Sequence, residues 1–516
     1  MAHLTPAVAT SSGAEASFQS LGIDIGTDVQ SHDVTTTNEE APGRPRSPIE
    51  TLPIELLRQI FSHCTDASDL SSSRHLPPLN LIRVCRLWRD IALAHGYLWS
   101  HFTITASRLY IFPPMFVIQD WLDRSQPYPL SLRITHRQNS SRRGRRISIL
   151  DLGKAITAFS VLDTCIQRCR ILSFDDRIIY SPHTGDSGVH KGLLKRAEVL
   201  EDLSVTMIPY DASPSPLIAG FFESVTSEDV PRLRTLQWTE PIPSNTSIPP
   251  LYSTLATNFI GTQLTTVVMN SVSDTDSCLR FMQTCPSLRE CRLQFNLRAT
   301  EAYWDVEQFI RLNNLRYLEC SGHLPPAGIV IDQLILPSLS NLVLCSRSED
   351  TAFDGVLTPL LHRSSPPLEV LVLRQVNILN ADLINSLRAV SSTLETLSIS
   401  SKPPLLPESL EELALLDNEG QPTLCPKLKK LSLHNCFVSL VSGISILAEH
   451  RLSSALQYCQ PLCLKITMSN DTFLGCPELH EYFDRLREWV IESGGQCPYK
   501  ANQPSVFTFE VHTIRI

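Results

Sequence analysis

Two pairs of cysteines have the spacing that places metal ligands on one face of a helix. They are Cys165 with Cys169 and Cys459 with Cys463, each four residues apart. A zinc site takes four ligands, so each pair needs a second Cys or His pair at a matching distance, and the sequence offers none. We therefore interpret these cysteines as structural, and we predict neither a metal nor a cofactor.

The short motifs that organise many enzyme sites are absent from the sequence. It contains no G-x-S-x-G, no G-x-x-x-x-G-K and no G-x-G-x-x-G. His480-Glu481 begins a metalloprotease pattern, but Asp484 occupies the place of the second His. We therefore predict that the chain is not an enzyme. Reviving a hydrolase or transferase would require His, Asp and Ser or Cys to converge from distant segments.

The composition fits a globular chain in a reducing compartment. Of 516 residues, 42% are hydrophobic and 19% are charged. The formal net charge of −9 gives no basic footprint for nucleic acid, and no apolar run is long enough to span a membrane. We also expect no signal peptide, because no basic region precedes an apolar core at the start. The fifteen cysteines are scattered, which favours a cytoplasmic or nuclear location.

A basic run, residues 142–146, lies in a polar stretch that contains several serines. Such a run suits a nuclear-import patch or a phosphorylation site. The alternative, which we favour, is a solvated loop, because short basic runs often carry no specific function.

Residues 47–104 contain two amphipathic helical patterns. In the first, Pro53 suits the opening position of a helix, and apolar residues then recur at helical spacing. These residues are Leu56, Leu57, Ile60, Phe61 and Cys64. The second apolar face consists of Leu81, Val84, Cys85, Trp88, Ile91 and Ala92. A domain of about 60 residues is only marginally stable alone, so we expect a partner.

Three spaced blocks of this segment resemble the F-box. They are Leu52-Pro53-x-Glu55-Leu56-Leu57-x-x-Ile60-Phe61, then Val84-Cys85-x-x-Trp88-x-x-Ile91-Ala92, and then Leu98-Trp99. A serine-rich loop over residues 62–78 departs from the family's pattern. Periodicity alone would equally fit two helices of a larger all-α unit.

The resemblance implies that the segment docks on a Skp-family adaptor and, through it, on a cullin. The implied docking residues are Leu52, Pro53, Leu56, Leu57, Ile60 and Phe61, with Val84, Cys85 and Trp88 holding the second helix.

From about residue 200 the unit Leu-x-x-Leu-x-Leu recurs with conservative substitutions. The units begin at Leu200, Leu233, Leu264, Leu288, Leu315, Leu339, Leu368, Leu394 and Leu428. Their intervals of 24 to 34 residues indicate leucine-rich repeats with loop insertions. A proline precedes the first Leu by two residues at Pro231, Pro286, Pro337, Pro366 and Pro426. Because proline disfavours helix in the residue before it, we expect each to end a helix and deliver an extended chain.

The flanking segments predict further units and a cap. Residues 116–122 have helical spacing, and residues 130–134, 171–174 and 178–180 have strand character. Near the end we predict strands at 462–466 and 507–511 around an amphipathic helix at 479–490. The predicted domains are a disordered tail (1–46), an F-box (47–104), a linker with irregular strand-helix units (105–195), leucine-rich repeats (196–470) and a C-terminal cap (471–516).

The residues between the apolar positions of such a repeat line its concave face. They are small and neutral toward both ends of the array, whereas the central units carry charges, a tyrosine and valines. Protein-binding hot spots are enriched in Arg and Tyr. We therefore predict a target-binding face formed by Glu290, Arg292, Tyr317, Glu319, Val343, Val370, Val372 and Arg374. The alternative is that these side chains only pair with one another across neighbouring strands.

The predicted fold is an α/β solenoid, with a short all-α F-box followed by an irregular leucine-rich-repeat horseshoe. The resemblance, to fungal-type F-box proteins with leucine-rich repeats, implies a substrate-recognition adaptor of an SCF-type cullin-RING ubiquitin ligase. Its repeats would hold an unknown protein target. The alternative is a leucine-rich-repeat scaffold without a role in ubiquitination, whose F-box-like segment packs only against its own array.

Overall fold

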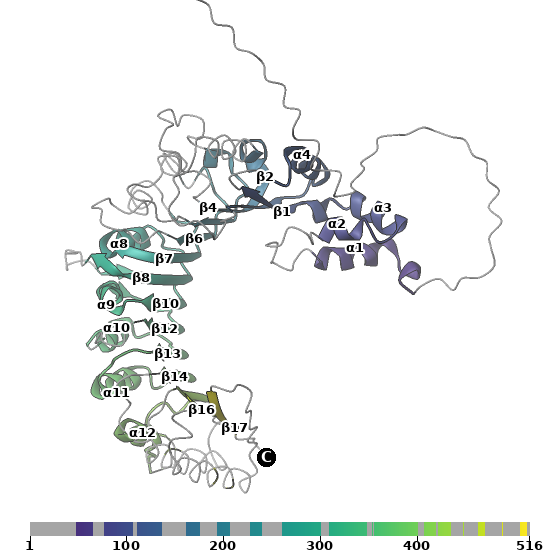
Figure 1. The fold of residues 1–516 in the computed structure, drawn as a ribbon. Helices are drawn as coiled ribbons and strands as arrows, with labels where there is room; N and C mark the ends of the chain where they lie inside the picture. Colours follow the sequence, from purple (N-terminus) through teal and green to yellow (C-terminus); the bar gives the residue numbers. More distant parts are fainter. Residues whose placement is uncertain are drawn as a thin grey trace, which may run out of the picture. The chain divides into compact units, whose positions relative to one another are not determined.

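The structure is a computed structural model (Figure 1). It describes residues 48–64, 77–106, 111–136, 161–175, 193–206, 226, 228–239, 261–300, 309–347, 353, 355–400, 407–418, 422–434, 447, 463–469, 484, 488 and 506–512. The chain divides into two units, Met1–Pro53 and Ile54–Ile516. The described part of the first unit includes one helical turn, η2 (Pro48–Thr51).

The second unit opens with short helices. They are α1 (Ile54–His63), α2 (Pro77–Leu81), α3 (Arg86–Ala94) and η3 (Gly96–Trp99). The single helical pattern expected from Leu81 to Ala92 is wrong, because a turn separates α2 from α3. Cys85 has an extended backbone with φ −156°, and its Sγ accepts the N–H of Trp88 at 3.5 Å. This cap starts α3 at Arg86.

One open sheet of fifteen strands runs through the described part of this unit. Its strands are β1 (His101–Ala106), β2 (Ile111–Phe112), β3 (Leu130–His136), β4 (Cys169–Asp175), β5 (Asp202–Thr206), β6 (Thr235–Thr239), β7 (Thr266–Asp274), β8 (Glu290–Thr300), β10 (Tyr317–Gly322), β12 (Asn341–Ser346), β13 (Val370–Arg374), β14 (Thr396–Ser400), β15 (Lys430–His434), β16 (Cys463–Ser469) and β17 (Val506–His512). All neighbours pair in parallel except β2 on β1 and β17 on β16, which are antiparallel.

Helices follow many of the strands, as parallel connections require. They are α4 (Met115–Arg124), η4 (Ile166–Arg168), η7 (Leu193–Arg196), α8 (Thr275–Gln283), α9 (Leu324–Asp332), α10 (Leu357–Ser364), α11 (Asn380–Ala389) and α12 (Pro407–Ala414). From α8 to α12 the consecutive helices contact each other and lie along one side of the strands (Figure 1). A small parallel pair, β9 (Ile310–Arg311) with β11 (Leu334–Ile335), lies outside the large sheet.

The core of the array is formed by the apolar residues of the recurring unit. Each of the nine predicted units contains a strand that begins two residues after its first Leu. The three apolar positions of every unit are buried, including those occupied by Trp238, Met269, Cys291 and Cys320. The parallel register stacks equal positions, so that Leu342 pairs with Leu318 on one side and Leu371 on the other. Partly or fully exposed side chains alternate with this core along the strands; most are polar, and Val343, Val370 and Val372 are among the exceptions.

The prolines ahead of the strands act differently from the prediction. In four units the proline is the second residue of a reverse turn, in which the first Leu donates its N–H three residues back. Leu288 donates to the carbonyl of Cys285 at 3.2 Å, with Pro286 between them. Leu264 makes the same bond to Gly261 without a proline. The prolines therefore preset a turn rather than an extended entry into the strand.

The sheet extends beyond the predicted array at both ends. Strands β3 and β4 cover the segments expected at 130–134 and 171–174, and α4 covers the helix expected at 116–122. Strand β1, which begins within the last residues of the F-box-like segment, was not predicted. Strands β16 and β17 confirm the two expected near the C-terminus. The basic run at 142–146 and the strand expected at 178–180 lie outside the described residues, as does the helix expected at 479–490 except Asp484 and Glu488.

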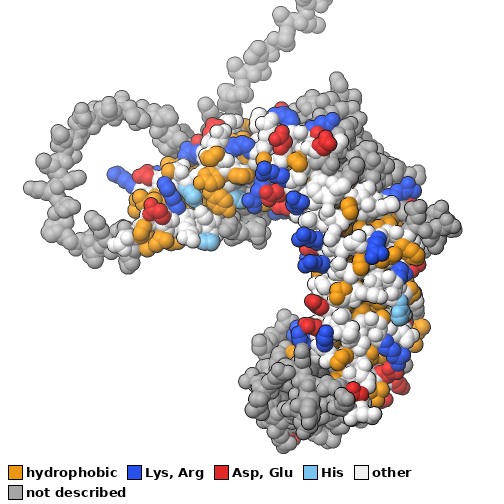
Figure 2. Space-filling view, turned by 180° about the vertical axis from the view of Figure 1, so that it is seen from behind, with side chains coloured by type: hydrophobic (Ala, Val, Ile, Leu, Met, Phe, Trp, Pro, Cys, Tyr) orange, Lys and Arg blue, Asp and Glu red, His pale blue; other side chains and the backbone are white. Residues whose placement is uncertain are grey.

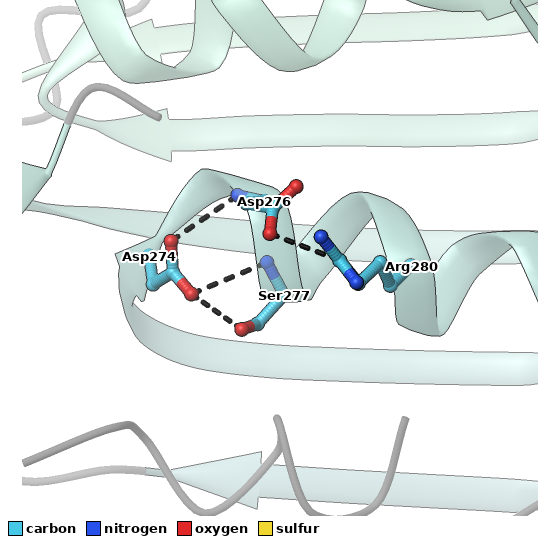
Figure 3. Close-up of polar contacts among 4 residues, drawn as sticks. All are labelled: Asp274, Asp276, Ser277 and Arg280. Atoms are coloured by element: carbon cyan, nitrogen blue, oxygen red, sulfur yellow. Dashed lines mark hydrogen bonds and ion pairs between the residues drawn. The ribbon is translucent and has the colours of Figure 1, made fainter. Parts of the chain in front are cut away.

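Helix α8 begins with a side-chain cap that fixes the chain after β7 (Figure 3). The Asp274 carboxylate accepts the backbone N–H groups of Asp276 and Ser277, each at 3.2 Å, and it also accepts the Ser277 hydroxyl. Asp276 pairs with Arg280 one turn later at 2.9 Å. Both carboxylates lie where a helix dipole favours negative charge, so the start of α8 is well defined.

Among the described residues, no helix combines the length and the apolar character that a membrane crossing requires.

Candidate protein-binding surfaces

Helix α1 carries two kinds of apolar side chain. Leu57 and Phe61 are completely buried, whereas the exposed fractions of Leu56 and Ile60 are 46% and 44%. Each pair is four residues apart and therefore shares one face of the helix. Of the predicted docking residues on α1, Leu57 and Phe61 are thus structural, and Leu56 and Ile60 are accessible to a partner.

Aromatic packing joins α1 to α3. The Phe61 ring lies 4.9 Å from the Trp88 ring between centroids, at an interplanar angle of 58°. In addition, the indole N–H of Trp99 donates to the backbone carbonyl of Ala92 on α3 at 2.8 Å. Trp88 therefore packs α3 against α1, and Cys85 caps the start of α3.

Val84 does not hold the second helix, which corrects its predicted role. Its exposed fraction is 58%, in the turn between α2 and α3. Leu87 on α3 and Ile54 on α1 are exposed as well. We call Ile54, Leu56, Ile60, Val84 and Leu87 the exposed apolar set. Hydrophobic side chains are visible on the surface of this helical region in Figure 2.

Sequence reasoning missed Ile54 and Leu87, because neither belongs to the recurring apolar pattern. The signal available was an apolar residue on an otherwise polar face. In the first unit, Pro53 is exposed and Leu52 is half-buried. Single exposed apolar residues are common, but several on two helices in mutual contact are typical of an interaction site.

The predicted target-binding residues on β8 and β10 form one polar cluster. The register places Glu290 beside Tyr317 and Arg292 beside Glu319. Arg292 pairs with Glu290 at 2.7 Å and lies 3.8 Å from Glu319. Its guanidinium carbon is 5.1 Å from the centre of the Tyr317 ring. These side chains do pair across strands, as the alternative interpretation expected.

The hydroxyl of Tyr317 completes this cluster. It donates to Glu319 Oε2 at 2.8 Å. Burial, assisted by this hydrogen bond and the nearby carboxylates, raises the pKa of Tyr317 to about 12. Tyr317 therefore acts as a neutral donor to Glu319, and the cluster is joined by this hydrogen bond and the ion pairs of Arg292.

The remaining predicted target residues lie on the next strands. Val343 pairs in register with Val372, and Asn341 with Val370. All three valines are half-buried, so they form a partly exposed apolar strip on the strands next to the polar cluster. Arg374 is exposed at the end of β13 and is not part of that cluster.

Arg374 belongs instead with a histidine two strands away. The register runs from Arg374 through Ser400 to His434. Burial, with contributions from Lys465 and Arg374, lowers the pKa of His434 below its usual 6.5. The predicted face thus separates into a mixed-charge cluster on β8 and β10 and a basic part from β13 to β16.

Cys165 and Cys169 are free, buried thiols. The Cys169 thiol donates to the backbone carbonyl of Cys165 at 3.4 Å, and hydrogen bonding with Cys165, together with burial, raises the pKa of Cys169. Cys169 is the first residue of β4, so the two do not share a helical face. Cys459 lies outside the described residues, and Cys463 belongs to β16.

Comparison with protein families matches residues 49–105 to the F-box-like family. This range nearly coincides with the segment whose motifs resemble the F-box. A search of curated proteins finds no match for the chain. The chain therefore contains an F-box-like domain at residues 49–105, followed by a large open sheet of parallel strands.

Proposed function

We propose that this chain is a substrate-recognition adaptor of an SCF-type cullin-RING ubiquitin ligase. The observation that carries the proposal is the F-box-like match at residues 49–105. F-box domains typically bind Skp-family adaptors, which connect them to a cullin. The cytoplasm or the nucleus is the location that we propose, since the fifteen cysteines are scattered along the sequence.

The exposed apolar set supports docking through α1 and α3. Leu56 and Ile60 share one face of α1, so both can enter the same partner groove. Each is already about half covered in the free chain, so burying the rest of both side chains contributes about 1.5 to 3 kcal/mol. Docking would use this face without disturbing Leu57 and Phe61, which are already buried.

The array supports a second interface, for the target. Nine regularly spaced strands, with buried apolar positions at Leu-x-x-Leu-x-Leu spacing, favour a degenerate leucine-rich repeat. The target would bind the exposed strand face around Arg292, Tyr317 and the valines of β12 and β13. In this role the chain contributes proximity, and the bond to ubiquitin is made by partner enzymes.

Co-purification of the full chain with a Skp-family adaptor and a cullin tests the proposal. We expect the wild type to retain both and Leu56→Ala with Ile60→Ala to lose both. Gln59→Ala is the matched control, because Gln59 is exposed on the same helix and is polar. A wild-type chain that captures no adaptor would favour the leucine-rich-repeat scaffold instead.

A further inference from the structure

One residue near the start of each strand from β4 to β15 forms a continuous row, which we call the edge row. Each member from Glu201 onward donates its backbone N–H to the carbonyl of the member before it, at 2.8 or 2.9 Å. The members are Arg170, Glu201, Arg234, Thr265, Arg289, Arg316, Ser340, Glu369, Glu395 and Lys429. Consecutive members are therefore direct neighbours along one edge of the sheet.

The ends of the edge row are neutralised by ion pairs. Arg170 pairs with Glu201 at 3.5 Å, and Lys429 pairs with Glu395 at 2.7 Å. In the middle, Arg234, Arg289 and Arg316 are exposed, and among the described residues no carboxylate lies within ion-pair distance of them. In Figure 2, Lys and Arg side chains (blue) lie along the left margin of the array, and Asp and Glu side chains (red) lie below them.

The guanidinium groups of the three arginines contribute little to the stability of the sheet. Arg289 and Arg316 are on adjacent strands, and like charges in that position are destabilising. The neighbouring hydroxyls bond to backbone instead, Thr265 to the Arg234 carbonyl at 3.3 Å and Ser340 to the Arg316 carbonyl at 3.1 Å. The hydrogen bonding of the sheet is thus satisfied without the guanidinium groups, apart from a long contact from Arg234 to the Gln263 carbonyl at 3.4 Å.

The spacing and chemistry of these arginines fit an extended acidic segment. Strands are about 4.8 Å apart, so Arg234 to Arg316 spans about 14 Å, the length of about four extended residues. Guanidinium groups bind carboxylates through paired hydrogen bonds. Beyond Ser340, Glu369 would repel such a segment and so limit its extent to the middle of the edge row.

We propose that Arg234, Arg289 and Arg316 bind an acidic segment of the target protein. This inference rests on the proposed adaptor function, to which it adds the chemistry of the target. It places the acidic contact at the strand starts, next to the polar cluster of Glu290 and Arg292.

The test is fluorescence anisotropy of a labelled peptide with six glutamates flanked by glycines, titrated with the full chain. We expect Arg289→Gln and Arg316→Gln each to weaken binding about tenfold and to reduce its salt dependence. Lys429→Gln is the control, because it removes the same charge from a neutralised end of the edge row. All variants should keep the wild-type melting temperature, since these side chains are exposed.

The proposal is overturned if the wild type does not bind the peptide, or if both Arg variants bind it as tightly as the wild type. It is also overturned if Lys429→Gln loses as much affinity as the Arg variants. Tighter Arg-dependent binding of a uridine decamer or of phosphatidylserine vesicles would overturn the choice of a protein segment. Adaptor co-purification is measured in parallel. Lost adaptor binding with retained peptide binding rejects the docking role alone, and the reverse result rejects the edge row alone.

Discussion

Phe61 and Trp88 pack with their ring centroids 4.9 Å apart, and this contact turns Leu56 and Ile60 of the same helix toward solvent. One short helix thus has a face that stabilises the domain and a face that is free to bind. Substitutions on the two faces should have different consequences, which makes the assignment of each residue testable.

Leu56→Ala with Ile60→Ala should abolish capture of a Skp-family adaptor while lowering the melting temperature much less than truncation of a buried residue of the same helix. Both side chains are about half exposed, so truncating them removes less buried area from the free chain than truncating Leu57 or Phe61 would. Pull-down and differential scanning calorimetry of the same preparation measure the two effects. Retained capture by this double variant would remove α1 from the docking surface.

Phe61→Ala should instead destabilise the F-box-like domain by about 3 to 5 kcal/mol, because it leaves a cavity under Trp88. Hydrogen exchange of α1 and α3 reports this locally, and adaptor capture should fall only as the domain unfolds. Full protection of both helices in this variant would mean that the Phe61 contact is not stabilising.

The difference between these faces could not be read from the sequence. Leu56 and Leu57 are the same residue type at adjacent positions, and helical spacing placed both in one apolar stripe. Which of them is buried depends on how α1 packs against α3 and η3, and those are tertiary contacts. The turn before α3 was missed for a related reason, since Val84 and Cys85 fit the helical period although Cys85 is a cap.

The array was much easier to predict, because each strand repeats the same local constraint. Two apolar positions with one residue between them must point to one side of a strand, and nine units agree on that side. Strand β1 has Trp99, Phe102 and Ile104 at the three apolar positions, so a pattern built on Leu passes over it although all three are buried. The contact of Arg292 with Glu319 does not follow from the sequence alone, because partners on neighbouring strands depend on the register between the strands and not on spacing along one strand.

Leu342→Asp should unfold several units of the array. Leu342 is fully buried between Leu318 and Leu371 in the register, and a charge at that position has no partner. Coupling between neighbouring units spreads the damage. Asn341→Asp, one residue earlier on the half-exposed face, is the control and should change the melting temperature little. Circular dichroism melts compare them; a normal melt for Leu342→Asp would show that the register is wrong.

His434 should make the array less stable as the pH falls below 6.5. Its pKa is lowered in the folded chain, chiefly by burial, so the unfolded chain takes up the proton first. The free energy of unfolding therefore decreases from pH 6.5 down to the folded pKa and then levels off. Arg374→Ala should raise the pKa of His434 and reduce this loss, because Arg374 is one of the cations that disfavour its protonation.

A histidine-labelled NMR titration, with His434→Gln to assign the signal, measures this pKa directly. Arg388→Ala is the control, since Arg388 is on helix α11 and pairs with Glu412. A wild-type His434 that titrates at or above 6.5 would contradict the expected acid sensitivity.

Arg292→Ala should weaken capture of the target by about 2 kcal/mol or more, as truncation of a hot-spot residue does. The same change should cost only about 0 to 1 kcal/mol of stability, because its ion pairs with Glu290 and Glu319 are partly exposed. Tyr317→Ala should act similarly by releasing Glu319. Thr396→Ala and Ser398→Ala, on the small neutral strand β14, are the matched controls and should change little. Quantitative proximity labelling compares the captured proteins. If the β14 variants lose them and Arg292→Ala keeps them, the target binds elsewhere on the array, and the cluster around Arg292 is a structural network that only pairs with itself.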